Sequence, residues 1–102
     1  MTARWRAGRA EWLQLHGWSM APALRHGDWL KVAPLDGAPR PGEVVAFLRN
    51  GRIVAHRVIS ADGARVITRG DSVGCADAPT PTGELLGRIV EVKKRSFWRR
   101  AA

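Results

Sequence analysis

Three kinds of side chain in this sequence could together form a hydrolytic site. Ser19 lies in a bend bounded by Pro and Gly, within the segment 17–28 that reads GWSMAPALRHGD. Such a bend can hold a hydroxyl outward at a fixed angle, as a nucleophile requires. Because a serine hydroxyl is unreactive near neutral pH, it needs a base and an acid that orients the base. The sequence offers His56 as the base and Asp71 or Asp77 as the acid.

The candidate base stands in an apolar run. His56 interrupts the segment 53–59, IVAHRVI, where a polar group requires a hydrogen-bond partner. The alternative interpretation is structural: Ser19 closes a turn, and His56 is a satisfied polar group on a sheet.

The elements that must position these residues are mostly strands. Asn50-Gly51 predicts a tight hairpin turn, which pairs Arg49 with Arg52 and places His56 opposite Val45. A short helical turn is expected at 20–25, beside Ser19. The expected strands are 11–16, 28–34, 43–49, 52–60 and 85–92.

A second hairpin bears on the choice of acid. If Asp62-Gly63 form its turn, His56 pairs with Arg69, and Asp71 becomes the diagonal neighbour of His56, roughly 7 Å away between backbones. A register slip of one residue would move every side chain to the other face. Asp77 lies six residues further along a loop and could fold back to the same place.

Length and composition set the class of protein. The 102 residues are expected to form one domain, with a basic N-terminal extension (1–13), a catalytic core (14–92) and a basic C-terminal tail (93–102). No stretch approaches the roughly 20 apolar residues of a membrane span, and the first residues are rich in arginine. We therefore expect neither a signal peptide nor an anchor, and a location in the cytoplasm or at a membrane surface.

The net charge of +8 bears on partners. Basic residues at both ends are interleaved with Trp5, Trp12, Phe97 and Trp98, a mixture that suits the surface of an anionic membrane. The same mixture suits a nucleic-acid backbone, and a solvated basic tail is the simplest alternative. We expect peripheral membrane contact and no nucleic-acid partner.

Other chemistries fit less well. A Ser-Lys dyad is disfavoured, since lysine occurs only at Lys31, Lys93 and Lys94, outside the predicted hairpins. The histidines and the single cysteine, Cys75, do not stand at metal-ligand spacings, so no metal and no cofactor is expected. Cys75 is interpreted as a loop residue.

The segments around these residues resemble the type I signal peptidases, within the clan that includes LexA-like self-cleaving repressors. The segment 17–28 matches the serine box of that family, and VAHRV (54–58) resembles the box that carries the base. Histidine at this position is typical of the archaeal, endoplasmic-reticulum and sporulation-type members. RPGEVVAF (40–47), TRGD (68–71) followed by Asp77, and LGRIV (86–90) resemble the remaining boxes, so the resemblance covers roughly residues 14–92.

The resemblance implies a mostly β, LexA/signal-peptidase-like fold of small coiled antiparallel sheets with at most one short helix. It implies Ser19 and His56 as catalytic residues, Asp77 as the triad acid and Asp71 as a supporting residue. The backbone N–H of Ser19 would then donate to the oxyanion. The other oxyanion and substrate contacts would come from Gly17, Met20 and Pro22.

The expected function is that of a serine endopeptidase that cleaves a leader or precursor peptide after small residues. Gly17 replaces a hydroxyl that some relatives use as an oxyanion donor, which leaves a non-catalytic peptide-binding module as one alternative. A self-cleaving regulatory domain is another, because Ala7-Gly8 is the dipeptide that LexA-like repressors cut. The oligomeric state and the natural substrate do not follow from the sequence.

Overall fold

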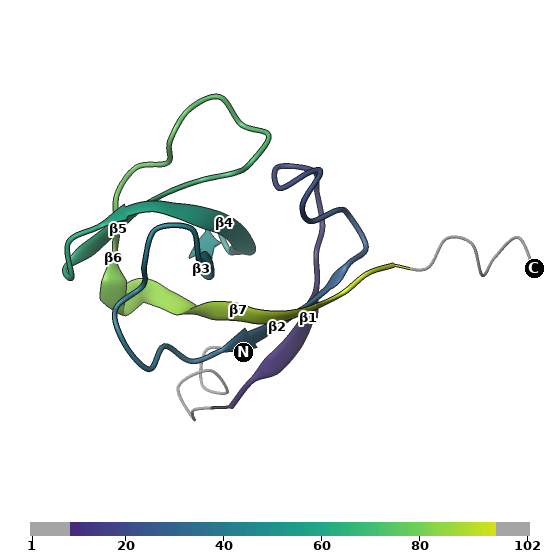
Figure 1. Ribbon diagram of the computed structural model, residues 1–102, viewed down its shortest axis with the longest axis horizontal. Helices are drawn as coiled ribbons and strands as arrows, with labels where there is room; N and C mark the ends of the chain where they lie inside the picture. Colours follow the sequence, from purple (N-terminus) through teal and green to yellow (C-terminus); the bar gives the residue numbers. More distant parts are fainter. Residues whose placement is uncertain (1–8, 96–102) are drawn as a thin grey trace, which may run out of the picture.

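β-branched and aromatic residues gather in short runs separated by Gly and Pro, and these runs pair into antiparallel strands. The computed structural model describes residues 9–95, in which seven strands form one sheet of order β1-β2-β7-β3-β4-β5-β6 (Figure 1). The elements are β1 (Glu11–Gln14), β2 (Trp29–Ala33), β3 (Val44–Arg49), β4 (Arg52–Ala61), β5 (Arg65–Arg69), β6 (Thr80–Pro81), the 3₁₀ turn η1 (Thr82–Glu84) and β7 (Leu85–Lys93).

The predicted mostly β fold is confirmed. Between residues 9 and 95 there is no α-helix, and the expected helical turn at 20–25 is a series of turns, one closed by a bond from Leu24 N–H to the Met20 carbonyl at 2.9 Å. The same range contains no helix that is long and apolar enough to cross a membrane.

The last long strand joins the two halves of the sheet. β7 pairs with β2 on one side and with β3 on the other, and in Figure 1 it crosses the middle of the molecule. A Cβ at Gly87 would lie 2.1 Å from the carbonyl oxygen of Ala33, so only glycine allows β7 to approach β2 so closely. Three buried clusters fill the interior: the first is Met20, Leu24, Leu30 and Ala55, the second is Val32 and Ala46, and the third is Val45, Phe47 and Val58.

The first hairpin has the predicted register. Arg49 pairs with Arg52 and Val45 pairs with His56, around a turn in which Asn50 and Gly51 have φ values of 53° and 77°. Both positive φ values are those of the tight turn that Asn-Gly favours.

The predicted register of the second hairpin is wrong. The chain turns one position later, because the Asp62 side chain accepts bonds from the N–H groups of Ala64 and Arg65 and its own N–H donates to the Arg65 carbonyl. Near the turn, each residue of β4 therefore pairs with a residue of β5 two positions further along than predicted. Beyond an irregularity between Val58 and Ser60, the offset from the predicted register is one position. Arg57 therefore pairs with Arg69 in the place predicted for His56.

Two loops meet at one end of the molecule. The loop between β1 and β2 carries Ser19, and the loop after β5 carries both candidate acids (Figure 1). The N–H of Ser72 donates to the Ser19 carbonyl at 2.9 Å, and the Ser72 hydroxyl donates to the Trp18 carbonyl at 2.7 Å. The two loops are thus bonded directly to each other.

Candidate active site

The loop that carries the candidate nucleophile, Ser19, is closed at its base by hydrogen bonds and anchored in the core. The Leu15 N–H donates to the Asp28 carbonyl at 2.7 Å, and the Gly27 N–H donates to the Leu15 carbonyl at 2.8 Å. Met20 is fully buried in the core, directly after Ser19 in the chain. A buried side chain next to a half-buried serine fixes the direction in which the serine hydroxyl points.

The side chain of Asp28 also stabilises this loop. Its buried carboxylate accepts bonds from the Arg25 N–H at 2.9 Å, the Arg95 N–H at 3.0 Å and the Lys94 ammonium at 3.0 Å. Burial alone would raise the pKa of Asp28, but these bonds outweigh that effect and hold the pKa below its ordinary value. The carboxylate therefore ties the serine loop to the end of β7.

The predicted nucleophile and base are in contact. The Ser19 hydroxyl lies 3.1 Å from Nε2 of His56, and Nδ1 of His56 lies 2.6 Å from Oδ2 of Asp77. An ionised carboxylate only accepts, so the neutral imidazole in this arrangement has its proton on Nδ1, and its Nε2 accepts from the serine hydroxyl. His56 is 4% exposed, which shields these bonds from water.

Asp77 is held by three donors. Oδ2 also accepts from the Thr68 hydroxyl at 2.6 Å, and Oδ1 lies 2.7 Å from Nη2 of Arg49. Burial of this carboxylate acts to raise its pKa, but the hydrogen bonds from Thr68, His56 and Arg49 outweigh it and hold the pKa below the ordinary value. The carboxylate is therefore ionised throughout the neutral range.

Asp71 has a different partner. Its two oxygens accept from Nε and Nη2 of Arg57 at 2.9 and 2.7 Å, in a bidentate pair. Bonds from Arg57 hold the pKa of Asp71 below its ordinary value, against the opposing effect of burial. Arg57 follows His56 in β4 and so points to the other face of that strand. The one-residue change of register is thus what separates Asp71 from His56.

Two further residues, Gly70 and Thr68, support the site although the sequence interpretation gives neither of them a role of its own. A Cβ at Gly70 would lie 2.7 Å from the Ser19 carbonyl oxygen, so only glycine lets the acid-bearing loop pass this close to the nucleophile. Thr68 is fully buried, and its register position opposite Val58 puts it on the same face of the sheet as His56. Because side chains alternate between the two faces of a strand, the correct register of β5 would have identified Thr68 as a residue on the His56 face.

The three positions proposed for oxyanion and substrate contacts lie around the serine. Gly17 is exposed, has a φ of 99° and donates its N–H to Nδ1 of His26 at 2.9 Å. Met20 lies beneath the site, where its sulfur accepts from the Asp71 N–H at 3.3 Å. Pro22 is exposed on the outer part of the loop.

The lysines have other neighbours. The Lys31 ammonium lies 5.9 Å from the centre of the Trp12 ring, and that of Lys94 contacts Asp28. Lys93 pairs with Trp29 at the end of β7. The hydroxyl of Ser19 has the imidazole of His56 as its neighbour instead.

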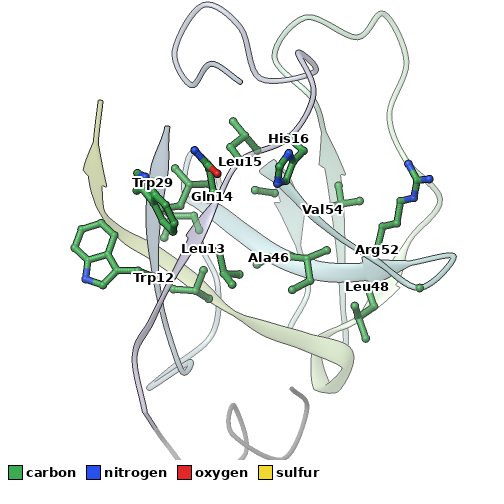
Figure 2. Close-up of a pocket in the computed structure, with 16 residues that line it drawn as sticks. Trp12, Leu13, Gln14, Leu15, His16, Trp29, Ala46, Leu48, Arg52 and Val54 are labelled. Atoms are coloured by element: carbon green, nitrogen blue, oxygen red, sulfur yellow. The ribbon is translucent and has the colours of Figure 1, made fainter. Parts of the chain in front are cut away.

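A groove of about 700 Å³ runs between β1 and the first half of β4 (Figure 2). β4 pairs with β5 only from Arg57 onward, and β1 pairs with β2 alone, so within residues 9–95 both walls present strand edges that pair with no other strand. The lining is largely apolar and includes Leu13, Leu15, Ala46, Leu48, Val54 and Ala55. The groove reaches Ala55, the residue directly before the catalytic candidate His56.

The family model described as Peptidase S24-like matches residues 3–82. The chain therefore belongs to the Peptidase S24-like family, a membership that supports a serine peptidase or a LexA-like self-cleaving domain. A search of curated proteins found no match. The narrower assignment to the type I signal peptidases stays a prediction.

Proposed function

We propose that this protein is a serine endopeptidase of the signal-peptidase type, which cleaves a leader or precursor peptide after small residues. The observation that carries the proposal is the continuous chain of contacts from the Ser19 hydroxyl through His56 to Asp77. A nucleophile, a base and an acid in this order have the relation that acyl transfer requires.

The reaction would proceed through an acyl-enzyme. The Ser19 oxygen attacks the scissile carbonyl carbon while Nε2 of His56 takes its proton, and the imidazolium then protonates the leaving amine as the C–N bond breaks. A water molecule, deprotonated by the same nitrogen, attacks the ester and releases Ser19. Asp77 would stabilise the imidazolium in both halves, and the backbone N–H of Ser19 would donate to the oxyanion.

The groove supports an extended substrate. Two strand edges offer main-chain donors and acceptors on both sides, so a peptide would insert as an additional strand. The apolar lining favours a peptide with apolar side chains.

Replacement of the nucleophile tests the proposal. Ser19→Ala is expected to abolish hydrolysis of an internally quenched peptide library and labelling by a β-lactam-type acylating probe, because both need the hydroxyl. Ser60→Ala, at an exposed serine of β4, is the matched control and should retain both activities. Wild type that shows neither labelling nor peptide hydrolysis would favour the peptide-binding alternative, and equal turnover by Ser19→Ala would refute the proposal.

The self-cleaving alternative meets a geometric obstacle. Ala7-Gly8 lies outside the described residues and precedes β1 in the sequence, whereas Ser19 follows the other end of that strand. Three residues between the bond and Glu11 span at most roughly 11 Å, about the length of β1 itself. Cleavage within one molecule would therefore require β1 to leave β2. We expect the mass of the intact chain to stay unchanged on incubation at raised pH.

The expected membrane contact stays a prediction. Trp5, Phe97 and Trp98 lie outside the described residues, whereas Trp12 and Trp29 are 40% and 42% exposed on the adjacent strands β1 and β2.

A further inference from the structure

One arginine takes part in the candidate triad although no sequence motif pointed to it. Arg49 is the last residue of β3, and its Nη2 lies 2.7 Å from Oδ1 of Asp77. The opposite oxygen of the same carboxylate, Oδ2, contacts the His56 imidazole. Arg49 and His56 therefore contact the two oxygens of one carboxylate.

The register of the first hairpin is what brings Arg49 to this place. Val45 pairs with His56, and alternate residues of β3 share a face, so Phe47 and Arg49 follow on the face that carries His56. The Asn50-Gly51 turn fixes that register, since a slip of one residue would turn Arg49 away.

An aromatic ring supports the guanidinium from one side. The Cζ atom of Arg49 lies 5.4 Å from the centre of the Phe47 ring, within the range of a cation–π contact. Phe47 is 3% exposed and meets the His56 ring edge-on, with the ring centres 6.0 Å apart. The guanidinium is therefore held by a buried ring and by a carboxylate whose side chain is 10% exposed, although its own side chain is 43% exposed.

We propose that Arg49 is a positioning residue of this site: it holds Oδ1 of Asp77 so that Oδ2 stays turned toward His56, and it extends the activity to lower pH by favouring the ionised carboxylate. This inference rests on the proposed peptidase function. Arg49 would act through Asp77 and would touch neither the substrate nor the reacting atoms.

The charges around Asp77 determine how strong this effect is. Arg49 is its cation on the β3 side, and Thr68 of β5 and His56 of β4 are its other hydrogen-bond donors. The other acidic groups nearby are Asp71, which is paired with Arg57, and Glu84, which lines a hollow of about 430 Å³ together with Arg49 and Asp77. Within residues 9–95, the ion pair at Oδ1 of Asp77 is the one with Arg49.

Two substitutions separate charge from geometry. Arg49→Gln removes the cation, so the Asp77 carboxylate becomes protonated at higher pH and the acid limb of the kcat/KM profile moves upward. Because the ion pair is partly exposed, we expect the ratio of kcat/KM at pH 5 to its plateau value to fall by up to about threefold below the wild-type ratio. Arg49→Lys keeps the charge but loses the planar donor group, so it should restore the acid limb while leaving kcat reduced.

A direct readout does not depend on catalysis. The chain has five aspartates, so the ¹³Cγ signal of Asp77 can be assigned by its loss in Asp77→Asn and followed through a pH titration. Its titration should move to higher pH in Arg49→Gln and return toward wild type in Arg49→Lys. Arg52→Gln is the matched control: Arg52 pairs with Arg49 across the same hairpin and carries the same charge, and it should shift the signal by less than half as much.

The outcomes separate the two proposals. A shifted Asp77 titration in a protein without peptidase activity would refute the proposed function and leave the electrostatic effect of Arg49 standing. Hydrolysis that Ser19→Ala abolishes, together with an unmoved acid limb and an unmoved Asp77 signal in Arg49→Gln, would overturn the role of Arg49. Equal shifts in Arg49→Gln and Arg52→Gln would also overturn it, because the effect would then be one of net charge alone.

Discussion

The two ends of the loop after β5 each carry an aspartate, and these aspartates have opposite surroundings. Asp71 gives both oxygens to one guanidinium, that of Arg57, in a pair whose side chains are 22% and 35% exposed. Asp77 divides its oxygens among an imidazole, a hydroxyl and a guanidinium, and its side chain is 10% exposed.

The difference shows that proximity in sequence does not decide which carboxylate serves a base. The bidentate pair with Arg57 fixes the orientation of the Asp71 carboxylate. Both oxygens of Asp71 face the guanidinium, so neither is turned toward the imidazole of His56. Asp77 has its donors on different strands, so their directions converge on a single orientation that faces His56. We therefore expect Asp71 to act on stability and Asp77 to act on catalysis.

Replacing each acid by its amide should separate them most clearly. Asp77→Asn presents an amide in place of the carboxylate, which favours the wrong imidazole tautomer, so kcat/KM is expected to fall about 10³- to 10⁴-fold, as in other Ser-His-Asp sites. Asp71→Asn should lower it by less than about tenfold. Steady-state hydrolysis of the fastest library peptide measures both, and equal losses would contradict the division of roles.

The glycines of the same loop offer a second contrast. Gly70→Ala would bring a Cβ to 2.7 Å from the Ser19 carbonyl oxygen and 3.0 Å from its Cβ, so the nucleophile must shift. A displacement of the order of 1 Å costs about 10²-fold in rate. At Gly74, by comparison, a Cβ meets nothing within 4 Å, and Gly74→Ala should keep the wild-type rate. Comparable rates for the two variants would show that the loop yields without moving Ser19.

Two hydroxyl groups, those of Thr68 and Ser72, form hydrogen bonds near the two aspartates, and we expect their removal to have smaller effects on the rate. Thr68→Val removes the 2.6 Å bond to Oδ2 of Asp77 and lets the pKa of that carboxylate rise, so kcat/KM should drop about tenfold and more steeply at acid pH. Ser72→Ala removes only a bond between the two loops and should cost about threefold or less. Rate profiles from pH 4 to 8 distinguish them, and a larger loss in Ser72→Ala would mean that loop contact matters more than the state of the acid.

The sequence predicted part of this site because part of it depends on local patterns. Asn50-Gly51 fixed one hairpin, and with it the place of His56, because this dipeptide strongly favours one turn. The second hairpin was mispredicted, since the Asp62 side chain bonds two backbone N–H groups and moves the turn by one residue. Only the resemblance assigns Asp77. In the structure its N–H donates to the Thr68 carbonyl at 2.8 Å, a bond across the loop that has no local signature in the sequence.

The smallest expected effect is the contribution of Asp71 to folding. Its pKa is lower in the folded protein than in the unfolded chain, so the stabilisation is complete above the ordinary carboxyl pKa of about 4 and is lost as the pH falls through the folded value. Because the pair with Arg57 is partly exposed, Asp71→Asn should lower the free energy of unfolding by only about 1 kcal/mol at pH 7. Urea denaturation should show this difference shrinking toward zero at the acid end of the titration. A difference that stayed constant with pH would mean that the carboxylate acts through shape rather than charge, and the contrast with Asp77 would then have to be drawn from catalysis alone.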